Sequence, residues 1–188
     1  MEKTELINYL RFIEEIEKLK SVERTAWSSN GRKESKAEHS WRLAMFAMVL
    51  CREYPKLNQS RVLVMCLIHD LGELYEGDVA AITKPDKKQK FDDEYQAIIK
   101  AVRYLPEQQR NDLIEIWQEY NDVKTPEAQL VKALDKAETI IQHNQGLNPT
   151  DFDYEFNLSY GKEYFEVDPI LEQMRLLLDD MTKSRIDK

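Results

Sequence analysis

The stretch SRVLVMCLIHDLGELY, residues 60–75, decides whether the fold is helical or mixed. Its part VLVMCLI contains enough β-branched and apolar residues to suit either a strand or a buried helix. No segment of comparable character is present to pair with it as a partner strand. We therefore predict a buried helix over residues 60–75, and with it an all-α fold.

Length and composition agree with this fold class. The chain has 188 residues, of which 42% are hydrophobic and 10% aromatic, which suits one domain with a packed core. Its five glycines and six prolines are few for an all-β protein, which needs frequent turns. We predict a single helical domain over residues 1–188.

Apolar residues at spacings of three and four predict the other helices. These are expected at about residues 5–20, 36–54, 92–104, 106–120, 126–144 and from 169 onward. The second is apolar nearly all round, which predicts a buried helix, and Ser35 with Glu38 fits a capping box at its start. Residues 21–35, 83–93 and 146–156 are predicted to be connections, and Gly77 is expected to end the helix over residues 60–75.

Charge and cysteine content limit the class of partner. The net charge of -8 argues against binding a long nucleic acid, because phosphate contacts normally need a basic surface. Cys51 and Cys66 form no CxxC pair, and the charged N-terminus does not look like a signal peptide. No apolar run approaches the ~20 residues that span a bilayer. We predict a reduced, cytoplasmic protein that does not enter membranes.

The charged residues inside the stretch over residues 60–75 are candidates for chemistry. Glu73 follows His69 by four residues and Asp70 by three, so all three side chains can face one cavity. Burial of an unpaired carboxylate is costly, so these groups need partners. A buried histidine beside acids is either a hydrogen-bonded core residue or a metal ligand, and this segment alone leaves both interpretations open.

Two further residues favour a metal. His39 lies at the start of the apolar helix over residues 36–54, so two of the three histidines lie in the two most hydrophobic helices. Asp135 lies on or beside an apolar stripe. Taken alone, this residue is better interpreted as a carboxylate that reaches solvent next to Lys132 or Lys136. Imidazoles and carboxylates without a thiolate suit a borderline transition metal. His143, in the polar run QHNQG, receives no role.

The set His39, His69, Asp70 and Asp135 resembles the HD-domain superfamily of metal-dependent phosphohydrolases, which has an all-helical fold. The segments LKSVERTAWSSNGRKESKAEHSW, HDLGELYEGD and LVKALDKAE are similar to its subfamily of 5′-deoxynucleotidases. The resemblance spans about residues 10–145. Residues 146–188 match no motif and are expected to form a helical extension.

The resemblance implies a role for each candidate residue. It implies a divalent ion, such as Mn, Co, Fe, Ni or Zn, held by His39, His69, Asp70 and Asp135. Glu73 and Asp78 match acids that the family uses in catalysis or, in some members, at a second metal position. Arg24, fifteen residues before His39, matches an arginine that binds the substrate phosphate. The lysines within residues 84–90 are the alternative phosphate site.

The implied activity is hydrolysis of (deoxy)nucleoside 5′-monophosphates to a nucleoside and inorganic phosphate. One alternative is another HD-type hydrolase, acting on alarmones, cyclic nucleotides or nucleoside triphosphates. Alarmone hydrolases have HDxxED, and here Leu74 replaces the second acid. A second alternative is a non-catalytic, metal-stabilised nucleotide-binding module. The presence of Glu73, Asp78 and Arg24 argues against it, because a purely structural site needs none of them. The resemblance also suggests a homodimer, with the apolar C-terminal helix either at its interface or completing the monomer core.

Overall fold

A computed structural model describes residues 2–75 and 86–187. Within these ranges the protein is helical apart from one two-stranded sheet, which confirms the all-α class. None of the helices in these ranges is long and apolar enough to cross a membrane. The α-helices are α1 (Lys3–Ile16), α2 (Lys36–Leu50), α3 (Gln59–Ile68), α4 (Lys87–Ala101), α5 (Glu107–Asp122), α6 (Pro126–Gln145), α7 (Phe156–Ser159) and α8 (Pro169–Ile186). The 3₁₀ helices are η1 (Glu17–Lys20), η2 (Cys51–Glu53), η3 (His69–Glu73) and η5 (Lys162–Phe165).

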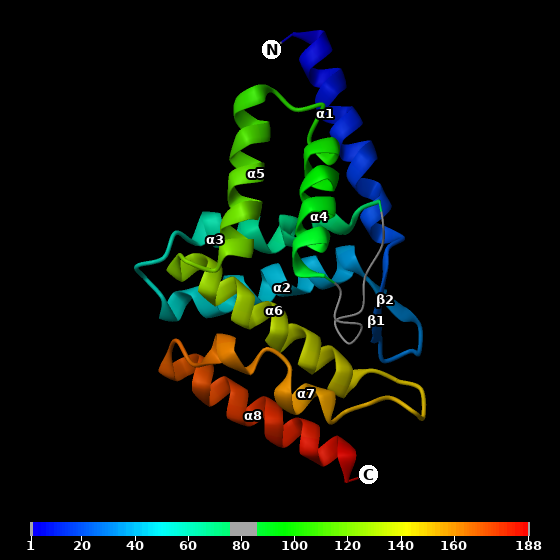
Figure 1. Ribbon diagram of the computed structural model, residues 1–188, viewed down its shortest axis with the longest axis vertical. Coiled ribbons are helices and arrows are strands. Elements are labelled where there is room, and N and C mark those ends of the chain that lie inside the picture. The colour runs from blue at the N-terminus through cyan, green and yellow to red at the C-terminus, as the bar shows by residue number, and fades with distance from the viewer. Residues whose placement is uncertain (1, 76–85, 188) are drawn as a thin grey trace.

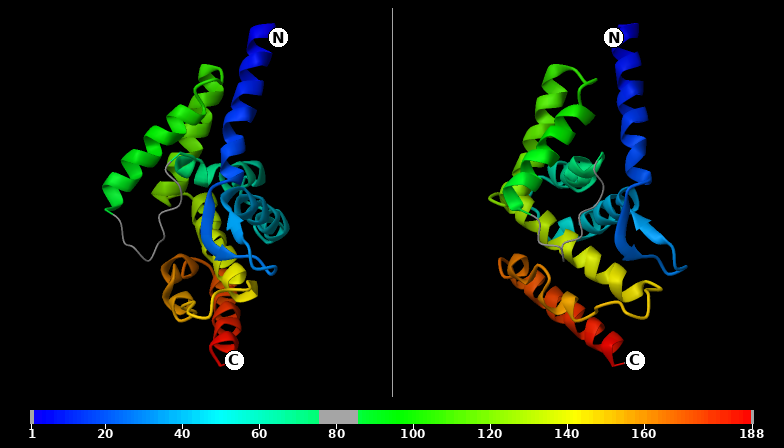
Figure 2. Two further views of the ribbon diagram at one scale, coloured as in Figure 1. Left: turned by 90° about the vertical axis from the view of Figure 1, so that its right-hand side faces the viewer. Right: turned by 45° about the vertical axis from the view of Figure 1, so that its right-hand side comes forward.

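Helix α6 is the central element of the fold. It packs against α2, α3, α5 and α8, as Figure 1 shows, with α2 and α3 lying across the middle of the molecule. Helices α4 and α5 rise on one side of this layer, and α8 covers α6 on the other side (Figure 2). The two chain termini therefore lie at opposite ends of the molecule.

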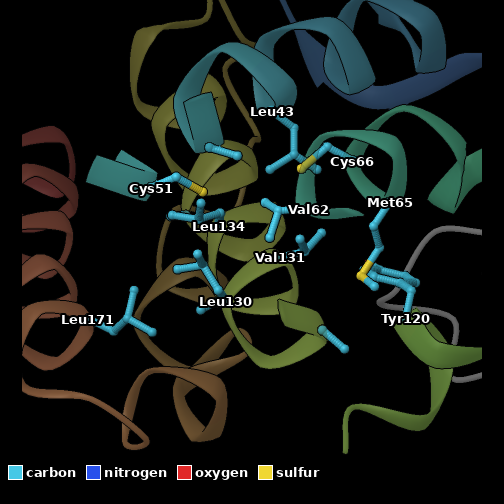
Figure 3. Close-up of a cluster of buried hydrophobic side chains, with 14 of the residues drawn as sticks. Leu43, Cys51, Val62, Met65, Cys66, Tyr120, Leu130, Val131, Leu134 and Leu171 are labelled. Atoms are coloured by element: carbon cyan, nitrogen blue, oxygen red, sulfur yellow. The ribbon is translucent and has the colours of Figure 1, made fainter. Parts of the chain in front are cut away.

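The main hydrophobic core lies between α2, α3, α6 and α8 (Figure 3). Leu43, Val62, Met65 and Leu134 are fully buried in it. The β-branched segment over residues 62–68 therefore belongs to a helix that packs against helices, as predicted. From His69 onward the same run continues as the tighter 3₁₀ helix η3.

A second core holds η3 against α4 and α5. It contains the fully buried Trp117, whose Nε1 donates a hydrogen bond to the carbonyl of His69 at 3.1 Å. Gly72 permits the close approach of α4, because a Cβ on Gly72 would lie only 2.7 Å from Cβ of Glu94. These contacts fix the backbone that carries His69 and Asp70.

Residues 21–35 form a β-hairpin instead of the predicted irregular connection. Strand β1 (Glu23–Trp27) pairs antiparallel with β2 (Lys33–Ser35), and Gly31 adopts a left-handed φ of 85° in the turn. The buried positions of β1 are Arg24 and Ala26. Because one inward position holds a charged residue, the apolar alternation of a half-buried strand is absent from the sequence.

Two other predictions about the helices were wrong. Helix α4 begins at Lys87 rather than near residue 92, because the side chain of Asp86 caps it by accepting from the amide of Gln89. Helix α2 is not buried all round, since Trp41 and Val49 are 62% and 65% exposed. The predicted role of Gly77 lies outside the described residues.

Candidate metal centre

A cavity of about 740 Å³ lies between β1, α2, η3, α4, α6 and the segment that precedes α7. Its walls bring together residues that are distant in the sequence. Of the residues singled out in the sequence, the cavity is lined by Arg24, His39, His69, Asp70, Glu73 and Asp135. Asp78 lies outside the described residues.

The cluster of His39, His69 and Asp70 forms where two helices begin. One ligand atom from each residue lies within 4.8 Å of the others, and all three side chains are buried. His39 lies in the first turns of α2, which the Ser35–Glu38 capping box opens as predicted. His69 and Asp70 are the first two residues of η3.

Asp135 joins this cluster from α6. Its Oδ1 lies 3.1 Å from Nε2 of His39 and 4.0 Å from Nε2 of His69. Its Oδ2 accepts hydrogen bonds from the Tyr120 hydroxyl at 2.7 Å and from Lys136 at 3.0 Å. The side chain is buried, so the interpretation of Asp135 as a carboxylate that reaches solvent is wrong.

The protonation state of His69 fits a role as a metal ligand. Its Nδ1 lies 2.9 Å from the carbonyl oxygen of Cys66. Because a carbonyl only accepts, Nδ1 carries the proton and Nε2 keeps its lone pair. Burial lowers the pKa of His69 to about 4, so the ring is neutral at pH 7. Nε2 itself is buried and has no hydrogen-bond partner in the described part of the chain.

The separations between these donor atoms also fit a divalent ion. Ligand atoms bound at about 2.0–2.2 Å around one ion lie about 3–4 Å apart. His69 Nε2 lies 3.4 Å from Asp70 Oδ1 and 4.0 Å from Asp135 Oδ1, and the His39–Asp135 contact is 3.1 Å. Two imidazoles and two carboxylates are an ordinary donor set for a borderline divalent metal.

Glu138 is a residue that the sequence analysis missed. Its Oε2 lies 2.5 Å from Nδ1 of His39, on the side of the ring away from Asp135. Carboxylates in this position orient a ligating histidine and increase its basicity. The available signal was the spacing, because Glu138 follows Asp135 by three residues and shares its face of α6.

We expect Glu138→Gln to weaken metal affinity about 10- to 100-fold, the usual effect of losing such an outer partner. The amide removes the negative charge that makes His39 a better donor. Titration with a divalent ion in competition with a chelator measures the change. Glu34→Gln is the matched control, because Glu34 shares Arg24 with Glu138 but makes no hydrogen bond to His39 in the described structure. Equal losses in both variants would contradict this role.

Arg24 is buried beside the cluster. Its Nη1 lies 2.8 Å from Glu34 and 3.3 Å from Glu138, and its Nη2 donates to Thr139 at 2.8 Å. Glu138 contacts both Arg24 and His39, so Arg24 is connected to the proposed ligand His39 through one intervening side chain. Both of its terminal nitrogens already have partners, and its predicted contact with a phosphate remains a prediction.

Glu73 lies on the other side of the cluster. Its Oε2 is 2.7 Å from Nζ of Lys36, and its Oε1 is 3.3 Å from Nζ of Lys90. Burial and the neighbouring Asp70 raise the pKa of Glu73 to about 7. The group can therefore gain or lose a proton near neutral pH. Lys36 was not singled out in the sequence, although it lies one helical turn before His39.

His143 lies in the last turn of α6 and is buried there, although its sequence neighbours are polar. Its Nδ1 is 2.7 Å from Oδ1 of Asn157, and its ring packs edge-on against Phe152 with centroids 4.9 Å apart. Trp27 also packs against Phe152 and lines the cavity with it. These aromatic groups form a cavity wall that the sequence did not reveal, because residues 146–156 have no periodic pattern.

The fold and site define a class of protein, namely a helical protein with a buried histidine–carboxylate centre that opens into a cavity. A sequence model of the HD domain matches residues 16–175. The chain therefore belongs to the HD-domain family.

Relatives and solved structures agree. The chain is 37% identical over 143 residues to the 5′-deoxynucleotidase HDDC2 of Dictyostelium discoideum. The aligned region covers 72% of this chain and 75% of that protein. It is 36% identical over 138 residues to the 5′-deoxynucleotidase HDDC2 of Homo sapiens, covering 72% and 67%. A crystal structure from Magnetospirillum magnetotacticum MS-1, described as a predicted metal-dependent phosphohydrolase, superposes with a TM-score of 0.82 at 28% identity, over 97% of this chain and 95% of that one. The resemblance to HD-domain 5′-deoxynucleotidases is confirmed.

Proposed function

We propose that this protein is a metal-dependent phosphohydrolase that removes phosphate from (deoxy)nucleoside 5′-monophosphates. The observation that carries the proposal is Nε2 of the neutral His69, which has no hydrogen-bond partner among the described residues and faces His39, Asp70 and Asp135 in the cavity wall. The relatives named 5′-deoxynucleotidases support the substrate class. A cavity of about 740 Å³ lies within the usual range for small-molecule sites.

The residues proposed to hold the ion are His39, His69, Asp70 and Asp135. A divalent ion bound there supplies Lewis-acid chemistry, because it polarises phosphoryl oxygens and makes water a better nucleophile near neutral pH. Mn, Co, Fe, Ni and Zn all suit mixed imidazole and carboxylate ligands.

The acids and Arg24 supply the remaining chemistry in this proposal. Glu73, with its pKa near 7, orients the attacking water and accepts its proton. Arg24 offsets the charge on the phosphoryl oxygens. Asp78 remains the candidate that protonates the leaving 5′-oxygen, or that joins Glu73 at a second ion.

Arg24→Ala is expected to raise KM for a nucleoside monophosphate about tenfold or more, since a hydrogen bond to a charged group contributes ~1.5–3 kcal/mol. It should also lower the free energy of unfolding by about 3–5 kcal/mol, because the buried Glu34 loses its cation and Glu138 keeps only Arg42. Steady-state kinetics and thermal unfolding measure the two effects. The exposed Arg32, which pairs with Glu38, provides the control Arg32→Ala.

A second variant separates the two effects of Arg24. Adding Glu34→Gln to Arg24→Ala removes one of the facing carboxylates and should restore part of the stability without restoring KM. If KM stays at the wild-type value in Arg24→Ala, the phosphate lies elsewhere, and the lysines within residues 84–90 become the first alternative.

A phosphate-release screen tests the function itself. Purified protein is assayed with deoxy- and ribonucleoside mono- and triphosphates and a cyclic nucleotide, with several divalent ions and with a chelator. We expect release from 5′-monophosphates that needs the ion. Preference for triphosphates or cyclic nucleotides would replace the proposed substrate class. Nucleotide binding without release would support the non-catalytic module.

We also propose a homodimer in the cytoplasm. Helix α2 exposes Trp41 and Val49, which are 62% and 65% accessible, and such apolar side chains on one face favour a protein contact. Cys51 and Cys66 are buried and form no disulfide, which suits a reducing compartment. Light scattering of the wild type and of Trp41→Glu tests the dimer, and a monomeric wild type would refute it.

A further inference from the structure

The cationic side chains that line the cavity differ in whether a carboxylate lies within ion-pair distance. Arg24 pairs with Glu34 and Glu138, and Lys136 lies 3.0 Å from Asp135. Lys36 and Lys90 both contact Glu73. Lys132 also lines the cavity, but no carboxylate within the described residues lies within ion-pair distance of its ammonium group.

Lys132 is placed close to the metal cluster by α6. It precedes Asp135 by three residues and therefore lies one turn away on the same face of the helix. Its Nζ stands 3.7 Å from the centroid of the Tyr120 ring, and the hydroxyl of that ring donates to Asp135. The ring of Tyr120 in turn packs against His69, with centroids 5.1 Å apart.

The surroundings of Lys132 leave its charge poorly compensated. Burial and the neighbouring Lys136 lower its pKa to about 8. The π-face of Tyr120 attracts the ammonium, but a cation–π contact replaces only part of the hydration that burial removes. A negatively charged ligand in the cavity would form an ion pair with Lys132 and compensate its charge.

We propose that Lys132 binds the phosphate group of the nucleotide substrate. This inference rests on the proposed function and adds a residue to its substrate site. Lys132 lies on α6 one turn before Asp135, whereas Arg24 meets α6 one turn after it, at Thr139. The two cations thus flank the proposed metal cluster from opposite directions along α6. A phosphate at the cluster lies between them, and lysine is a common phosphate ligand.

The experiment uses the full-length, metal-loaded protein with Lys132→Met, which keeps the unbranched stem of the side chain and removes the ammonium group. Inorganic phosphate is the probe for binding, measured by calorimetry, and a deoxynucleoside monophosphate is the substrate for kinetics. We expect phosphate affinity to fall and KM to rise about 10- to 100-fold, the usual effect of a lost hydrogen bond to a charged group. The effect should appear in KM more than in kcat.

Three controls separate binding from structure. Lys132→Arg keeps the cation and should restore most of the affinity. Lys124→Met removes an exposed lysine near the start of α6 and should leave both values unchanged. Metal content should match the wild type in all three variants, and the thermal midpoint should not fall in any of them. Wild-type phosphate affinity and KM in Lys132→Met, or an equal loss in Lys124→Met, would overturn the proposal.

Failure of this inference can be told apart from failure of the proposed function. If no nucleotide is hydrolysed by the wild type but Lys132→Met still loses phosphate affinity, the function is wrong and the role of Lys132 stands. If the wild type hydrolyses monophosphates and Lys132→Met behaves identically, the function stands and Lys132 is not a phosphate ligand.

Discussion

His69→Ala is expected to lose the divalent ion and the phosphohydrolase activity together. The proposed donor atom is Nε2, which is buried and has no hydrogen-bond partner in the described structure, so an alanine removes a proposed ligand from the cluster. Loss of an outer-shell partner already weakens metal binding about 10- to 100-fold, and loss of a direct ligand should exceed that. Metal content after dialysis and phosphate release with added ion measure the two losses.

The matched control for this prediction is His143→Ala. His143 is also a buried histidine that lines the cavity, but its ring bonds to Asn157, outside the metal cluster. It should keep the ion. If His69→Ala retains the wild-type metal content, the cluster of His39, His69, Asp70 and Asp135 is not the metal site.

Glu73→Gln is expected to keep the metal and lose most of the activity. Glutamine has nearly the same shape, and its single carbonyl oxygen can still accept from one of the two lysines, Lys36 or Lys90, so the side chain should keep its place. It cannot accept a proton from the attacking water, and loss of such a group costs about 10²–10⁴-fold in rate. The decrease should appear in kcat, while metal content stays at the wild-type value.

Glu94→Gln is the control for Glu73. Both glutamates contact Lys90 and line the cavity, so both variants remove one negative charge from the same region. Only Glu73 lies next to Asp70 and has its pKa raised to about 7. Full activity in Glu73→Gln would remove it from the mechanism and leave Asp78 as the candidate acid. A comparable decrease in both variants would point to a general effect of charge.

The helical periodicity was sufficient to predict most of the fold, because side-chain spacing along a helix is a local property. The helices over residues 126–144 and from 169 onward agree with α6 and α8. The hairpin could not be predicted, since the inward position of Arg24 is stable only when Glu34 and Glu138 approach it. The exposure of Trp41 likewise depends on which face of α2 the other helices leave uncovered.

The residue types of the site and their positions on separate helices follow from local sequence, because a histidine and a carboxylate inside apolar segments need polar partners wherever the chain folds. Which of these groups meet depends on how the helices pack. Asp135 is buried against His39, Tyr120 and Lys136, and Glu138 bonds to the far side of His39. These contacts join α2, α5 and α6, so the burial and charge state of each group depend on helix packing that no local pattern encodes.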